Sequence, residues 1–249
     1  MQRLAYDIKK NGAKRVFGLT YYDIAALVFF LFCWLGYHVF LEHWLFGKDS
    51  LNSIMNSFRF DWMKQMEVRE VRMVDTQIMG SLQNGTAFFA STSLLAIGAA
   101  ATLLRATDDV LQIFQDLPFG VSPSRGLWEL KAIGLMLIFG YAFFKFSWSY
   151  RLFNYAAILM GATPSASATD LVARRQMATR AGEMIVVAGS HFNRGQRAFF
   201  FALAYLGWFI GPIVFVVTSL SVVLVMALRQ FHSSALRAVK LTLTKLPDD

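Results

Sequence analysis

The sequence predicts an all-α, polytopic membrane protein with four transmembrane helices and long amphipathic helical extensions outside the membrane. The strongest observation is residues 198–228, a stretch of 31 residues without a charge. At 1.5 Å per residue, such a helix exceeds the ~20 residues that cross a ~30 Å hydrocarbon core. Charged residues make up 16% of the chain, whereas soluble globular chains carry about 25%. The composition therefore agrees with a membrane protein.

Three further apolar segments predict the other spans. Residues 21–41 are apolar except for Asp23 at the edge and His38 near the end, and residues 86–104 are uncharged. Residues 127–148 qualify when the aromatic residues that flank their apolar centre belong to the same helix. Residues 1–20 are too polar for a cleavable signal peptide. We expect one integral membrane helical domain over residues 1–249.

The charge of the chain indicates the surfaces that it meets. The net charge is +8 and the pI is about 9.7, but the Lys and Arg residues are spread over every polar segment. This distribution favours anionic lipid headgroups over nucleic acid as partners. Four spans would divide the 24 Lys and Arg equally between the two sides. The charges nearest the span ends predict that both termini are cytoplasmic.

The segments between the spans are patterned as amphipathic helices. Apolar residues recur at helical spacing over residues 51–78 after a possible N-cap at Ser50, with Gly80 and Gly85 allowing a bend. Residues 161–164, Gly-Ala-Thr-Pro, predict the end of a helix that extends the third span. Thr169 could cap a further helix to about residue 192. These helices either extend the bundle beyond the membrane, which the pattern favours, or lie flat on the headgroups.

Four sequence strings resemble a known family: SIMNSFRFDWMKQMEVREVRMVD, FFASTSLL, YAFFKFSWSYRLFNYAAILMGATP and FNRGQRAFFFALAYLGWFIGP. Together they resemble the bacterial and plant membrane family catalogued as domain of unknown function 599, over roughly residues 21–231. The chain departs from the family pattern at Leu152, where Gln is common, and at Phe199 and Phe200, where Tyr is usual. The resemblance implies a four-span protein of the cell membrane and brings no activity.

Chemical motifs are scarce. His38, Glu42 and His43 are the best metal candidates, but His43 lies far round the helix from His38, and interfacial polar residues are the favoured interpretation. The sequence has no nucleophile elbow, Walker A motif or Gly-rich dinucleotide loop. We therefore expect no catalytic residue, no metal and no cofactor.

Small residues indicate close helix packing in two spans. Thr92, Ala96 and Ala100 recur every four residues, and so do Gly207 and Gly211, with Pro212 predicting a kink. Packing within one bundle is favoured over a subunit interface.

Five polar residues just beyond the spans are expected at a common depth: Arg59, Arg151, Asn154, Asn193 and Arg197. The arginines could bind an anion or a lipid headgroup. They could also pair with carboxylates such as Asp61, Glu67, Glu70 or Glu183 as structural contacts, which is the favoured alternative.

These observations predict a non-enzymatic accessory or interaction subunit, or a membrane scaffold. Its expected partners are anionic lipids and either further copies of the chain or another membrane protein. The first alternative is an oligomeric channel or small transporter lined by the Arg/Asn layer, and the second is an enzyme of membrane lipids. Acidic residues are absent from the interiors of the predicted spans, which argues against a proton-coupled carrier.

Overall fold

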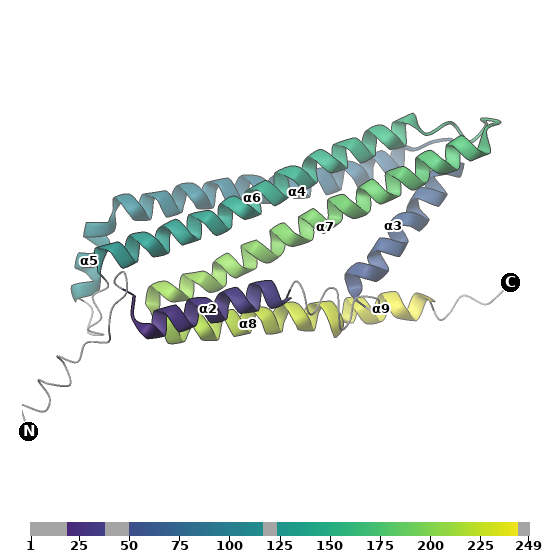
Figure 1. Cartoon of the computed structure of the whole chain (residues 1–249). Coiled ribbons are helices and arrows are strands. Elements are labelled where there is room, and N and C mark those ends of the chain that lie inside the picture. Colours follow the sequence, from purple (N-terminus) through teal and green to yellow (C-terminus); the bar gives the residue numbers. More distant parts are fainter. Residues whose placement is uncertain (1–18, 38–49, 117–123, 244–249) are drawn as a thin grey trace, which may run out of the picture.

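The structure is a computed structural model that describes residues 19–37, 50–116 and 124–243, and its fold is all-α. The helices are α2 (Tyr21–Gly36), α3 (Leu51–Val68), α4 (Met73–Arg105), α5 (Thr107–Asp116), α6 (Arg125–Ala162), α7 (Leu171–Ile210), α8 (Pro212–Phe231) and α9 (Ser234–Leu243). Figure 1 shows α4, α6 and α7 as three long neighbouring rods. Helices α2 and α8 lie together at one end of these rods, and α3 lies beside the other end.

Side chains define where several helices begin. Thr20 and Asp23 form a reciprocal capping box at the start of α2. Ser50, Ser124 and Asp170 each accept a hydrogen bond from the backbone N–H three residues later. These contacts satisfy N–H groups that have no partner within the helix. Ser50 is confirmed as an N-cap, whereas the cap of α7 is Asp170 rather than Thr169.

Helices α6 and α7 are longer than a membrane-spanning helix needs to be. Helix α6 has 38 residues and α7 has 40, so they are about 57 and 60 Å long, twice the ~30 Å hydrocarbon thickness. The extension of the third span is therefore confirmed. Its predicted end at residues 161–164 is confirmed as well, since α6 stops at Ala162.

An apolar half of the molecule contains α2, α8 and the parts of α4, α6 and α7 beside them. Its core includes Phe30, Leu135, Phe201, Trp208 and Phe215. Its outer faces are also apolar, and large side chains there are strongly exposed, for example Leu95, Leu137, Phe144 and Ile213. A surface of this kind suits contact with lipid chains.

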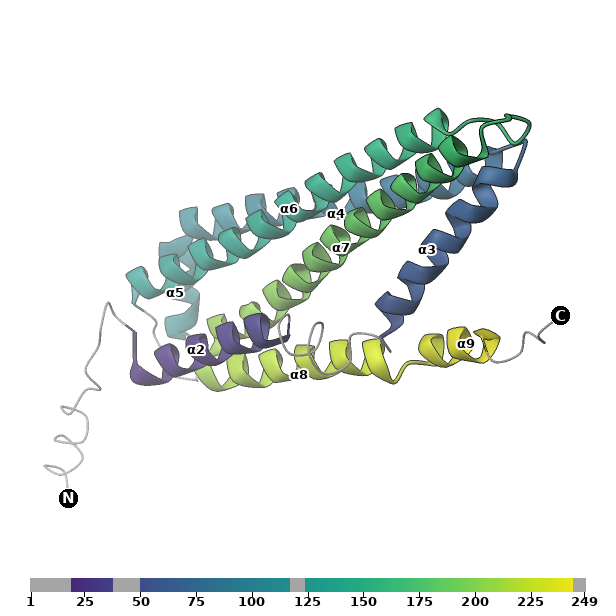
Figure 2. The same ribbon diagram turned by 45° about the vertical axis from the view of Figure 1, so that its right-hand side comes forward.

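A charged half contains α3 and the remaining parts of α4, α6 and α7. Its separate core is built around Met63, Met66, Phe153 and Ile185. Helix α3 packs against α7 here, and Figure 2 shows it running from the far end of the long helices to the end of α8. The predicted single helix over residues 51–78 is wrong, because the chain leaves helical geometry at Arg69 and α4 starts at Met73. Helix α4 then continues through Gly80 and Gly85.

The predicted span over residues 198–228 is not one helix. Helix α7 ends at Ile210, Gly211 is extended, and α8 begins at Pro212 and runs back beside α7 (Figure 1). Pro212 has no N–H to continue the helical ladder but fits the first position of a new helix. The expected kink at Pro212 is therefore a reversal of direction.

In the described part of the chain, three segments are long and apolar enough to cross a membrane: Met73–Arg105, Arg125–Ala162 and Pro212–Lys240. They indicate a multi-pass membrane protein. Helix α2 is apolar but shorter, and residues 38–41 of its predicted span lie outside the described residues.

Contacts place the start of α2 and the end of α8 in the apolar half. Asp23 of α2 contacts Trp208 near the end of α7, whereas Arg229 near the end of α8 shares a cavity with Arg197. Helix α2 therefore begins, and α8 ends, at opposite ends of the apolar half (Figure 1). The hairpin of α7 and α8 is an element that the four-helix prediction lacked.

Candidate functional site

Polar residues face each other along the contact between α3 and α7. Asn52, Asn56 and Arg59 follow one another at spacings of four and three on α3, so they share a helix face. The Arg59 guanidinium donates to Asn56 Oδ1 at 2.5 Å and lies against the backbone of Gly189, where an added Cβ would approach it to 2.7 Å. Asn193 and Arg197 occupy the next two turns of the same α7 face.

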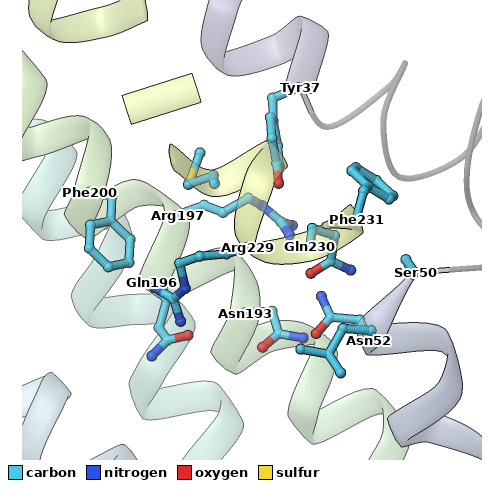
Figure 3. A pocket seen from close by; sticks show the side chains of 12 residues that line it. Tyr37, Ser50, Asn52, Asn193, Gln196, Arg197, Phe200, Arg229, Gln230 and Phe231 are labelled. Atoms are coloured by element: carbon cyan, nitrogen blue, oxygen red, sulfur yellow. The ribbon is translucent and has the colours of Figure 1, made fainter. Parts of the chain in front are cut away.

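This polar contact opens into a cavity of about 130 Å³ where the end of α8 meets α3 and α7. Figure 3 shows Asn52, Asn193, Arg197 and Gln230 pointing into a common space, with Arg229 turned towards Gln196 and Phe200. The full lining is Tyr37, Ser50, Leu51, Asn52, Asn193, Gln196, Arg197, Phe200, Met226, Arg229, Gln230 and Phe231.

The cavity is electropositive and rich in hydrogen-bond donors. It contains two guanidinium groups, and none of its described lining residues is acidic. The Arg229 guanidinium lies over the Phe200 ring, 5.8 Å from its centroid. Farther along α3, burial lowers the pKa of the Arg59 guanidinium from its ordinary value. Such a set of donors is suited to an anion with several acceptor oxygens.

The cavity lies at the edge of the apolar half. After Arg197, α7 carries no charge up to Ile210, and α8 carries none from Pro212 to Leu228. On α6, the 13 residues between Lys131 and Lys145 carry no charge, which is about 20 Å of helix. The two cavity arginines thus lie where the uncharged parts of α7 and α8 meet the charged half.

The five predicted polar residues do not form one layer. Asn193 and Arg197 line the cavity, and Arg59 lies two turns away along the contact of α3 and α7. Arg151 is exposed, where its Nε donates to the Tyr155 hydroxyl at 2.6 Å. Asn154 instead accepts from Gln83 Nε2 at 2.7 Å, which joins α4 to α6.

The predicted carboxylate pairs are not formed by Arg59 or Arg151 within the described part of the chain. Asp61 pairs with Lys64, and Glu67 Oε2 is buried without a hydrogen-bond partner there. Sequence reasoning missed Arg229 and its neighbour Gln230. Their position directly after the long uncharged run was a usable signal, but only the hairpin shows that this run returns to Arg197.

The predicted packing residues have different roles. Ala100 is buried, Ala96 packs against the apolar core, and the Thr92 hydroxyl donates to Phe88 within α4. A Cβ on Gly207 would approach Thr218 Oγ1 to 2.5 Å, so Gly207 permits the close contact of α7 with α8. Gly211 has no such neighbour within the described residues, and together with Pro212 it forms the turn.

A second polar cluster lies at the far end of the apolar half. Trp208 Nε1 donates to Asp23 Oδ1 at 2.8 Å, and Lys131 Nζ donates to the Trp208 carbonyl at 2.7 Å. All three side chains are buried. The carbonyl of Trp208 lies in the last turn of α7, where carbonyls lack helical partners and a cation is favourable.

The described residues contain no candidate metal site. Among residues 19–37, 50–116 and 124–243, no three His, Cys, Asp or Glu side chains gather as metal ligands would. The predicted metal candidates His38, Glu42 and His43 lie outside these residues.

The fold and the cavity define a multi-pass helical membrane protein with a basic, amide-rich pocket at the edge of its apolar half. The chain belongs to the family described as "Protein of unknown function, DUF599", which matches residues 25–235. This confirms the resemblance found in the sequence. No curated protein and no solved structure matches the chain.

Proposed function

We propose that the protein is a non-enzymatic membrane scaffold that holds a rigid helical bundle at the membrane surface for binding to another protein. The observation that carries this proposal is the continuity of α6 and α7. Each runs unbroken from the apolar half to the end of the charged half. Because helices of this length are stiff, the position of the charged half is fixed relative to the apolar half.

Polar side chains reinforce this rigid connection. Ser149 Oγ donates to the Ala188 carbonyl at 2.8 Å, which joins α6 to α7 in the buried interior. Arg72 donates to the carbonyls of Met160, Thr163 and Pro164, which fixes the start of α4 to the connection between α6 and α7. These side chains act as interhelical clamps, which favours a structural role over catalysis for the polar interior.

The far end of the charged half offers a binding surface. Six large apolar side chains are exposed there around the α3–α4 turn and the start of α7: Val68, Val71, Met73, Val74, Leu171 and Val172. Exposed apolar groups remote from the membrane-facing half are typical of protein contacts. A partner protein with an apolar surface is the occupant that we propose, and a second copy of the chain is the alternative outcome.

The proposal assigns five membrane crossings: α2, α4, α6, the last part of α7, and α8. The side on which α2 begins then holds eight of the 24 Lys and Arg residues, namely the five before Tyr21 together with Arg105, Arg125 and Lys131. The other side holds 16. Because cytoplasmic segments carry an excess of Lys and Arg, the charged half is assigned to the cytoplasm of a cell (inner) membrane protein.

Site-specific photocrosslinking in intact cells tests the scaffold function. A photoreactive amino acid at Val71 should crosslink to one other protein, identified by mass spectrometry, and Val74→Asp should abolish that product. The same amino acid at Leu137, which is 70% exposed where Val71 is 71%, is the matched control and should capture lipid. A Val71 product containing two copies of this chain would replace the partner by self-association, and the absence of any protein product would contradict the proposal.

A channel finds less support. Arg151 is exposed on the outside of α6, and Asn154 is engaged with Gln83. The polar residues that were expected to line a conduit therefore face different directions.

A further inference from the structure

We propose that the cavity between the ends of α3, α7 and α8 is a binding site for a phosphate group, with Arg229 as its principal cationic ligand and Arg197 beside it. This inference goes beyond the scaffold function, since it assigns a ligand to a site on the other end of the charged half. It depends on three observations: free donor capacity, the size of the cavity, and its position.

Free donor capacity distinguishes this cavity from the other polar contacts. In the described part of the chain, Arg229 forms no salt bridge, and its guanidinium lies over the Phe200 ring. The side chains of Asn52, Asn193, Gln196 and Gln230 also make no hydrogen bond to another described residue, and each is partly accessible to solvent. Elsewhere in the fold, comparable side chains are engaged: Asn154 with Gln83, and Arg72 with three carbonyls.

The donor types fit phosphate better than a carboxylate or a halide. A guanidinium presents paired N–H groups at the spacing of two phosphate oxygens. The four amide side chains supply further N–H donors from three different helices. A group with three or four acceptor oxygens can engage several of these donors together, whereas a carboxylate has only two oxygens.

The size of the cavity agrees with this class of ligand. Its volume of about 130 Å³ is several times the roughly 10–15 Å³ that a single water molecule requires. A phosphate group fits this space.

The position of the cavity suggests where the phosphate comes from. Leu51, Phe200, Met226 and Phe231 form apolar parts of its wall, and the apolar faces of α7 and α8 continue from it. A phospholipid headgroup would place its phosphate beside the arginines and its glycerol and acyl chains along these faces. Free phosphate would make the same contacts with the arginines, but it has no acyl chains to contact the apolar wall.

The experiment measures binding to the purified full-length protein in a neutral detergent. Dioleoyl phosphatidic acid is compared with dioleoylglycerol, which has the same acyl chains without phosphate, and with inorganic phosphate alone. Native mass spectrometry counts the lipid molecules bound to the protein, and isothermal titration calorimetry measures the binding of inorganic phosphate. We expect phosphatidic acid to bind at least about tenfold more tightly than dioleoylglycerol, because hydrogen bonds to charged groups contribute strongly once water is excluded.

Variants test whether Arg229 is a residue that binds the phosphate group. Arg229→Gln should weaken phosphatidic acid binding about tenfold or more, and Arg229→Lys, which keeps the charge without the paired donors, should give an intermediate loss. Arg237→Gln is the matched control, because Arg237 is exposed on α9, on the same side of the molecule, and does not line the cavity. Thermal unfolding of each variant without ligand shows whether the fold is retained, and the comparison with Arg229→Lys remains informative where Gln lowers stability.

The two sources of phosphate give different results. Binding of phosphatidic acid that millimolar inorganic phosphate does not displace identifies a lipid headgroup. Inorganic phosphate that binds alone and competes with the lipid identifies a soluble anion, and both results support a phosphate site. Equal binding of dioleoylglycerol and phosphatidic acid, or equal effects of Arg229→Gln and Arg237→Gln, would overturn the proposal.

Discussion

Lys131 Nζ lies 2.7 Å from the carbonyl oxygen of Trp208. This bond joins the first part of α6 to the last turn of α7, just before the chain reverses at Gly211. The same Trp208 donates through its indole to Asp23 of α2. One tryptophan therefore connects a buried lysine and a buried aspartate across three helices, and the hairpin turn is fixed at the point where the helical hydrogen bonds end.

We expect Lys131→Met to lower the free energy of unfolding by about 2 kcal/mol, since a hydrogen bond from a charged donor to a buried carbonyl is lost. Thermal unfolding in detergent measures this change. Lys145→Met is the control, because Lys145 is partly exposed with its ammonium over the Tyr141 ring, a contact worth about 0.5–1 kcal/mol. Equal effects of the two substitutions would show that the bond to Trp208 does not stabilise the hairpin.

Gly207→Ala should destabilise the protein by about 1–3 kcal/mol, because the added methyl group overpacks the contact between α7 and α8. It would meet Thr218 Oγ1, which donates to the Ala204 carbonyl at 2.7 Å. Gly98→Ala provides the comparison, since its Cβ would meet no described atom within 4 Å. Chemical denaturation in micelles should show a loss for the first variant and none for the second.

Reporter tags before residue 1 and after residue 249 should lie on opposite sides of the membrane, with the C-terminal tag in the cytoplasm. The reason is that α2 begins and α8 ends at opposite ends of the apolar half. Fluorescent-protein and alkaline phosphatase fusions in a bacterial host give this result directly. Two tags on the same side would mean that the last part of α7 does not cross the membrane.

Arg72→Ala should lower the free energy of unfolding by about 2–4 kcal/mol, because several hydrogen bonds from one charged group to carbonyls are lost together. Limited proteolysis should also cut residues 163–170 faster, since Arg72 holds the carbonyls of Thr163 and Pro164. Arg175→Ala, at an exposed position on α7, should change stability by less than about 0.5 kcal/mol. An unchanged rate of cleavage in the Arg72 variant would show that Arg72 does not hold the carbonyls of Thr163 and Pro164 in place.

Arg59→Gln should destabilise the protein more than Arg151→Gln. Arg59 packs against Gly189 and bonds to Asn56, so its removal leaves a gap at the contact of α3 and α7 and costs about 1–2 kcal/mol. Arg151 is exposed and contacts Tyr155 one turn away, so its loss should cost less than about 0.5 kcal/mol. Differential scanning fluorimetry measures the two changes in stability. A larger loss for Arg151→Gln than for Arg59→Gln would show that Arg151 has a partner in the membrane.

The sequence alone determined the all-α class, the membrane environment and the family. It also determined the extension of the third span and its end at Ala162. These properties depend on composition and on contacts between residues close in the chain, such as the Ser50 cap and the stop at residues 161–164. The residue type at Gly207 likewise indicated a close approach of helices.

Only the tertiary structure decided that residues 198–228 fold back on themselves. A run of apolar residues has the same hydropathy whether it forms one long helix or two that meet at Gly211 and Pro212. The reversal depends on contacts between distant residues: Thr218 with Ala204, and Lys131 with Trp208. It also brings Arg229 back to Arg197. Arg151 lies outside the layer in which it was expected, because depth along a helix does not determine which face of that helix a residue occupies.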